Sequence, residues 1–122
     1  AEASHLAGEL VCKFKKERPP LPAIALNDPV ILTAISNDYG FTFVFRRQVE
    51  ALGKRGDVLV TLTTSGKSPN ILWAEEKARE IGMEVIRFTT NNETGKDTAG
   101  PQIIHLDLIH QVCEIAEGEM FK

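Results

Sequence analysis

The stretch of sequence that decides the fold reads Leu59-Val60-Thr61-Leu62-Thr63-Thr64-Ser65-Gly66-Lys67-Ser68-Pro69-Asn70. Residues 57–62 form a nearly continuous apolar run, which predicts a strand covered on both faces, as in parallel α/β proteins. A loop rich in hydroxyl side chains follows, and Pro69 favours the first turn of a helix. Ligands of open parallel sheets bind beyond the carboxyl ends of the strands, so we expect this loop to belong to a binding site.

The loop has the chemistry of a phosphate site. A helix N-terminus offers backbone N–H groups and the positive end of the helix dipole. Four hydroxyls can donate further hydrogen bonds to phosphate oxygens: those of Thr63, Thr64, Ser65 and Ser68. The nucleotide-binding spacings G-x-x-x-x-G-K-[ST] and G-x-G-x-x-G are both absent. The pattern favours a monophosphate held by neutral donors, and the alternative is a polar turn in which Ser68 is an ordinary N-cap.

Helices and strands alternate on both sides of this stretch. Apolar spacing and the positions of Pro and Gly predict helices at residues 2–16, 29–36, 43–52, 69–81 and 102–120 and strands at 23–26, 57–62 and 83–88. Residues 37–40 and 91–100 are expected to be turns or loops. This order predicts an α/β domain with a parallel sheet over residues 1–122. Three strands are few, and the chain opens inside a helical pattern, so we expect an N-terminal part of the domain to be missing.

Composition narrows the class of protein. The chain has 122 residues, 43% of them hydrophobic and 25% charged, with a net charge of -3. The sequence has no basic face of the kind that binds a nucleic acid. Its apolar runs are all shorter than the ~20 residues that a membrane-spanning helix needs. Cys12 and Cys113 form no C-x-x-C pair, and we expect two packed, reduced thiols. The sequence therefore predicts a soluble cytoplasmic protein.

A second candidate site begins at the N-terminus. His5 and Glu9 are four residues apart, so on a helix they share a face. An imidazole and a carboxylate there can bind one divalent metal, and His110 could complete the set. Nitrogen and oxygen ligands without thiolate suit zinc and leave other divalent metals open. The alternatives are a surface pair at His5 and Glu9 and a packed histidine at position 110.

Several segments together resemble the phosphoheptose isomerases of the SIS (sugar isomerase) family. The Thr-Ser-Gly-x-Ser sequence at residues 64–68 is similar to the family's phosphate signature. The other similar segments are Arg18–Leu26, Ser36–Gly40, Phe45–Gly53, Gly56–Leu59 and Ile109–Ile115. The resemblance implies a three-layer αβα sandwich with a parallel sheet, of the flavodoxin or Rossmann-like kind.

The resemblance also implies an activity: conversion of sedoheptulose 7-phosphate to D-glycero-D-manno-heptose 7-phosphate through an enediol, for heptose-containing glycans such as the lipopolysaccharide core. It implies one Zn²⁺ per subunit, with the ligands His5, Glu9, Gln102 and His110. Glu9 would be the base and His110 the partner acid. The implied substrate contacts are Glu9, Asn37, Asp38, Thr63, Thr64, Ser65, Ser68 and Gln102. The family's members are homotetramers.

The chain departs from the family at several places. The family's Gly-Asn-Gly-Gly-Ser loop is absent before Ala1, residues 91–100 are shorter than usual, and Gly100, Pro101 and Ile103 replace the usual neighbours of Gln102. Two non-enzymatic alternatives are an adaptor for the replication initiator protein and a sugar-phosphate sensor. An adaptor need not keep His5, Glu9 and His110 together, so their joint presence favours the enzyme.

Overall fold

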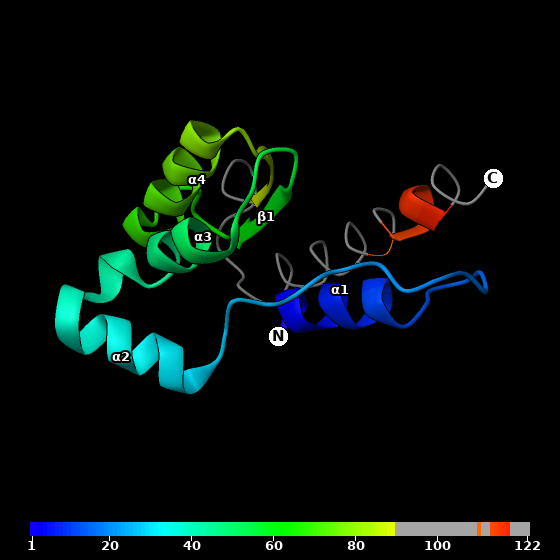
Figure 1. Ribbon diagram of the computed structural model, residues 1–122, viewed down its shortest axis with the longest axis horizontal. Coiled ribbons are helices and arrows are strands. Elements are labelled where there is room, and N and C mark those ends of the chain that lie inside the picture. The colour runs from blue at the N-terminus through cyan, green and yellow to red at the C-terminus, as the bar shows by residue number, and fades with distance from the viewer. Residues whose placement is uncertain (90–109, 111–112, 118–122) are drawn as a thin grey trace. The chain divides into compact units, whose positions relative to one another are not determined.

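A computed structural model describes residues 1–89, 110 and 113–117 (Figure 1). The chain divides into two compact units. The terminal unit contains Ala1–Ala25 and Lys96–Lys122, and the central unit contains Leu26–Gly95. Within the described ranges, no helix is long and apolar enough to cross a membrane. Gln102 and the predicted loop at 91–100 lie outside the described residues, as does most of the predicted helix at 102–120.

The central unit is built on two parallel strands. β1 (Val58–Thr63) pairs with β2 (Glu84–Thr89), in a register that sets Val58 opposite Glu84 and Thr63 opposite Thr89. The connection between them is α4 (Pro69–Ile81), so the three elements form a βαβ unit. The predicted strands at 57–62 and 83–88 are confirmed to within one residue at each end.

The core of the central unit lies between the sheet and two helices. α3 (Arg46–Leu52) and α4 lie side by side, and α4 packs against both strands (Figure 1). Four buried side chains form the centre of the core: Val49, Leu59, Ala74 and Ala78. The small Ala74 and Ala78 are one helical turn apart, and they let α4 approach the strands closely. The carboxyl end of β1 is thereby held at the N-terminus of α4.

α4 has the bounds that the sequence predicts, because both of its ends carry local signals. Pro69 is at its first position, where the missing N–H costs no hydrogen bond. Gly82 ends it in the left-handed conformation, with φ of 97°, and donates its N–H to the carbonyls of Ala78 and Arg79. Residues with a Cβ rarely adopt this φ, so glycine is favoured here.

α2 (Pro29–Tyr39) begins as predicted and ends later than predicted. The Asp28 carboxylate caps it by accepting from the N–H groups of Val30 and Ile31. The predicted break at residues 37–40 is wrong for Asn37, Asp38 and Tyr39, which lie in the last turn of the helix. A short 3-10 turn, η1 (Phe41–Phe43), follows, so the predicted helix at 43–52 begins only at Arg46.

The predicted strand at residues 23–26 is wrong for the part of the chain that the structure describes. These residues form no strand, and the Ile24 side chain is 66% exposed. An apolar tetrapeptide becomes a strand only when a neighbouring strand pairs with its backbone. Leu26 instead packs against the core of the central unit through its side chain.

In the terminal unit, α1 (Glu2–Val11) is shorter than the predicted helix at 2–16. The backbone N–H groups of Phe14, Lys15 and Lys16 donate to the carboxylate of Glu117, at distances of 2.7–3.0 Å. A side chain about a hundred residues away thus takes the amides that a longer helix would direct to its own carbonyls. Helical spacing alone gave no sign of this competition.

Candidate functional site

Three predicted side chains meet in the terminal unit. His5 Nε2 lies 2.8 Å from Glu9 Oε1 and 3.1 Å from His110 Nε2. His110 Nε2 lies 3.3 Å from the same Glu9 oxygen. The i, i+4 spacing on α1 brings His5 and Glu9 together, and the C-terminal segment supplies His110. His5 and Glu9 are therefore more than a surface pair, because a third polar group converges on them.

The cluster fits a divalent cation. One ligand atom from each of the three residues lies within 4.8 Å of the others. The distances of 2.8–3.3 Å are comparable with the ~3.3 Å edge of a tetrahedron whose corners lie about 2.0 Å from zinc. The second Glu9 oxygen, Oε2, is buried and finds no hydrogen-bond partner among the described residues. A cation bound by Glu9 Oε1 and the two imidazole nitrogens would relieve the contact between those nitrogens.

Two neighbours of the cluster were not predicted to belong to it. The Phe14 ring stacks on the His110 ring, with centroids 5.1 Å apart and planes 20° apart. Cys113 is fully buried, and burial together with the nearby Glu9 carboxylate raises the pKa of its thiol to about 12. The prediction of two packed thiols holds for Cys113 and is wrong for Cys12, which is exposed. Phe14 had no spacing signal that pointed to the cluster, whereas Cys113 follows His110 by three residues, a spacing that places two side chains on one helix face.

The hydroxyl loop lies in the central unit, between β1 and α4. Thr63 Oγ1 accepts from the Gly66 N–H at 3.3 Å, and Ser65 Oγ accepts from the Lys67 N–H at 3.0 Å. Gly66 has φ of 70°, which permits the tight turn. Ser68 is the N-cap residue of α4, but its side chain makes no capping hydrogen bond. The loop is therefore not explained by an ordinary serine cap.

An ion pair between the buried Glu75 and the partly exposed Arg87 lies next to this loop. Glu75 on α4 is fully buried and accepts hydrogen bonds from Thr61 Oγ1 at 2.7 Å and Arg87 Nε at 3.0 Å. Burial by itself would raise the pKa of Glu75, but the hydrogen bonds from Arg87 and Thr61 outweigh it and lower that pKa. Arg87 Nη1 also reaches the carbonyl of Gly66 at 3.5 Å. The three residues tie both strands and α4 to the loop.

Asn37 and Asp38 are exposed in the last turn of α2. Asn37 Nδ2 donates to Asp38 Oδ1 at 3.3 Å. The described contacts join this pair neither to the hydroxyl loop nor to the cluster of His5, Glu9 and His110. Their predicted substrate contacts stay a prediction.

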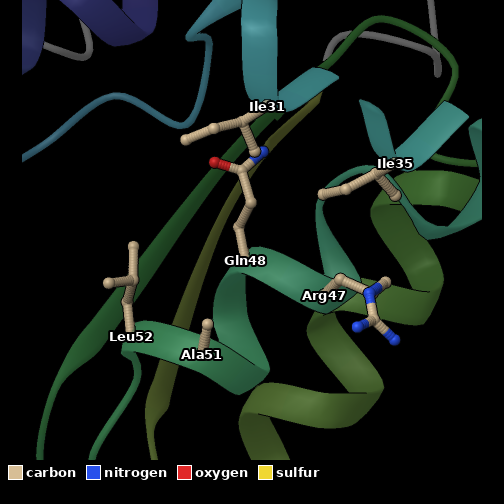
Figure 2. Close-up of a pocket in the computed structure, with 6 residues that line it drawn as sticks. All are labelled: Ile31, Ile35, Arg47, Gln48, Ala51 and Leu52. Atoms are coloured by element: carbon tan, nitrogen blue, oxygen red, sulfur yellow. The ribbon is translucent and has the colours of Figure 1, made fainter. Parts of the chain in front are cut away.

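A hollow of about 270 Å³ lies between α2 and α3, where Ile31 and Ile35 face α3 (Figure 2). Its other lining residues are Arg47, Gln48, Ala51 and Leu52. The Gln48 amide already donates to the carbonyl of Val44 at 2.9 Å. The hollow contains none of the predicted site residues, and its mostly apolar wall does not suit a sugar phosphate.

Comparisons with known proteins agree with the sequence analysis. The SIS domain family model matches residues 1–90. A phosphoheptose isomerase of Bradyrhizobium sp. (strain ORS 278) is 47% identical over 136 aligned positions, which cover 100% of this chain and 69% of the relative. One of Burkholderia pseudomallei (strain 1710b) is 47% identical over 135 positions, covering 99% of this chain and 68% of the relative.

Solved structures are similar as well. A phosphoheptose isomerase from Francisella tularensis has a TM-score of 0.83 at 39% identity, covering 93% of this chain and 69% of the other. One from Neisseria gonorrhoeae has a TM-score of 0.84 at 37% identity, covering 96% and 70% of the two chains. The predicted α/β fold class is confirmed by these similarities together with the parallel pairing of β1 and β2.

Proposed function

Because this chain belongs to the phosphoheptose isomerases of the SIS domain family, we propose that it interconverts sedoheptulose 7-phosphate and D-glycero-D-manno-heptose 7-phosphate as an aldose–ketose isomerase. The observation that carries the proposal is the convergence of His5, Glu9 and His110. A replication adaptor need not keep such a cluster, so its presence favours the enzyme. The product would feed the synthesis of heptose-containing glycans such as the lipopolysaccharide core.

The reaction moves a proton between two adjacent carbons, and we assign the two transfers to Glu9 and His110. Glu9 would remove the proton from C1 of the ketose, and His110 would protonate the carbonyl oxygen at C2 to give the enediol. The buried Glu9 Oε2 has no hydrogen-bond partner among the described residues, so it is available as a base. A positioned base contributes about 10²–10⁴-fold to the rate.

The same cluster would hold a metal ion, and zinc suits its nitrogen and oxygen ligands best. His5, Glu9 and His110 would bind it, with Gln102 as the fourth protein ligand. A bound divalent cation would polarise the sugar's carbonyl group and lower the barrier by several kcal/mol. Glu9 and His110 thus have overlapping roles as ligands and as proton-transfer groups.

The hydroxyl loop would bind the phosphate of the substrate. Thr63, Thr64, Ser65 and Ser68 supply hydroxyls next to the N-terminus of α4, where the helix dipole also favours an anion. Asn37, Asp38 and Gln102 would contact the sugar. Holding the phosphate fixes the reacting carbons before chemistry begins, and such positioning is a large part of catalysis.

We further propose that the chain forms a single SIS domain that works in the cytoplasm as a homotetramer. Unpaired Cys12 and Cys113 fit a reducing compartment. α2 buries none of its side chains in this chain alone, and its Val30 is 74% exposed. An apolar surface of this kind suits contact with further subunits.

The proposed activity is tested by following sedoheptulose 7-phosphate with the protein by NMR. We expect an aldose 7-phosphate to form, and unphosphorylated sedoheptulose to react far more slowly because the loop cannot hold it. A chelator should remove most of the turnover, and added Zn²⁺ should restore it. A metal-loaded protein that converts none of the ketose phosphate would instead support the adaptor.

A further inference from the structure

The carboxylate of Glu117 is an unusually well-satisfied buried anion in the terminal unit. Its side chain is 3% exposed and accepts from three consecutive backbone N–H groups and from Arg18 Nε at 3.0 Å. The N–H donors belong to Phe14, Lys15 and Lys16. Burial would raise the pKa of Glu117, but these donors outweigh it and lower the pKa to about 2. The four donors therefore favour the ionised carboxylate of Glu117.

Arg18 connects the Glu117 carboxylate to the turn of α1 that carries Glu9, the residue that we assign as the base. Its side chain is fully buried, and its Nη2 donates to the backbone carbonyl of Glu9 at 2.8 Å. Nη1 donates to the carbonyl of Leu10 at 2.8 Å. Carbonyls in the last turn of a helix have no helical partner, and a cation there also suits the helix dipole. The guanidinium thus holds the turn of α1 that carries Glu9.

Glu117 is also connected to His110. His110, Cys113 and Glu117 recur at intervals of three and four residues, which is the spacing of residues that share one helix face. Phe14, whose N–H donates to Glu117, also stacks its ring on His110. The Arg18–Glu117 pair therefore connects the Glu9 turn of α1, the segment after α1 and the helix of His110.

We propose that Arg18 and Glu117 are positioning residues, which hold Glu9 and His110 at the separation that metal binding and proton transfer require. This inference rests on the proposed function, because it assigns a purpose to the geometry of the same cluster. A buried ion pair is weak evidence for stability by itself, since apolar residues can often replace it. Its directional contacts with the Glu9 carbonyl and with the amide of Phe14 point to geometry instead.

The test compares Glu117→Gln with Glu114→Gln in the full chain. Glu114 lies on the same helix segment, but it is exposed and pairs only at the surface with Lys15. The readouts are Zn²⁺ affinity, by competition with a chromophoric chelator, and the visible absorption spectrum of bound Co²⁺. Far-UV circular dichroism and cooperative unfolding report whether each variant is folded.

We expect folded Glu117→Gln to bind Zn²⁺ about 10–100-fold more weakly, as is typical when a residue that orients metal ligands is lost. Its Co²⁺ spectrum should differ from that of the wild type, while Glu114→Gln should match the wild type in both. A purely structural role would lower the unfolding midpoint and leave both metal readouts unchanged in the folded protein. That outcome, or a wild type that binds no Zn²⁺, would overturn the proposal.

Arg18→Lys serves as the second variant if Glu117→Gln does not fold. Lysine keeps the positive charge beside Glu117 but loses the planar fork that reaches two carbonyls. Unchanged Zn²⁺ affinity in folded Arg18→Lys would reject the positioning role, and failure of both variants to fold would count against it by showing that the pair is required for folding itself. A wild type that binds zinc but does not isomerise the sugar phosphate would reject the proposed function. The Zn²⁺ affinities and Co²⁺ spectra would still test whether Arg18 and Glu117 position the metal ligands.

Discussion

Replacing Glu9 by glutamine is expected to lower kcat for sedoheptulose 7-phosphate by about 10²–10⁴-fold. Glutamine has nearly the same shape as glutamate, so α1 should remain folded. It cannot accept a proton at neutral pH, and the buried Oε2 that we assign as the base is lost. The measurement is steady-state kinetics together with the zinc content of each protein. Zinc retained with kcat lost would identify proton transfer as the missing step.

Glu17→Gln is the matched control for this variant. Glu17 is an exposed glutamate that forms an i, i+4 pair with Lys13 at 2.9 Å, so it has the same sequence spacing as the His5–Glu9 pair. We expect its kcat and KM to equal those of the wild type. Activity of Glu9→Gln within a few-fold of the control would reject Glu9 as the base.

Glu75→Ala is expected to lower the free energy of unfolding by about 2–3 kcal/mol at pH 7. The substitution leaves Arg87 and the buried Thr61 hydroxyl without their acceptor, and hydrogen bonds to charged groups are worth about 1.5–3 kcal/mol each. Arg87 is partly exposed and can turn to water, which keeps the loss below that of a fully buried pair. Urea unfolding measures the difference.

The neighbouring Glu76→Ala provides the control for Glu75→Ala. Glu76 is on the same helix, its side chain is 63% exposed, and its nearest Arg46 nitrogen is 4.0 Å away. We expect a change within about 0.5 kcal/mol, as for other surface substitutions. Equal effects of the two substitutions would show that the buried network does not stabilise the central unit.

Lowering the pH should remove the contribution of Glu75 to the free energy of unfolding. Its pKa is lowered in the folded protein, so its contribution to stability is present above the ordinary carboxyl pKa and is lost as pH falls through the folded value. The difference between wild type and Glu75→Ala should therefore shrink below about pH 4.5. A difference that grew on acidification would contradict the assigned ion pair.

The parts of the fold that the sequence predicts well carry their signals locally. α4 has Pro69 at one end and Gly82 at the other, and β1 is a mostly apolar run that ends at the hydroxyl loop. The end of α1 depends instead on Glu117, which is more than a hundred residues from Phe14. Residues 23–26 have strand composition, but strand formation depends on a partner that local sequence does not reveal.

The candidate site likewise contains residues that local sequence indicates and residues that only the folded chain brings together. His5 and Glu9 are recognisable as a pair from their spacing, and the hydroxyl loop from its position between a strand and a helix. His110 joined them through family resemblance, and the structure brings all three together. The Arg18–Glu117 and Glu75–Arg87 pairs have no periodicity, because each links elements that meet only in the folded chain.

The most direct test of the account is the reaction of sedoheptulose 7-phosphate in D₂O with the zinc-loaded protein, followed by NMR and mass spectrometry of the aldose. Proton transfer by Glu9 through an enediol lets solvent exchange with the moving proton, so the product should carry deuterium at C2. Deuterium incorporation at C2 by Glu9→Gln at the wild-type rate would contradict the role of Glu9.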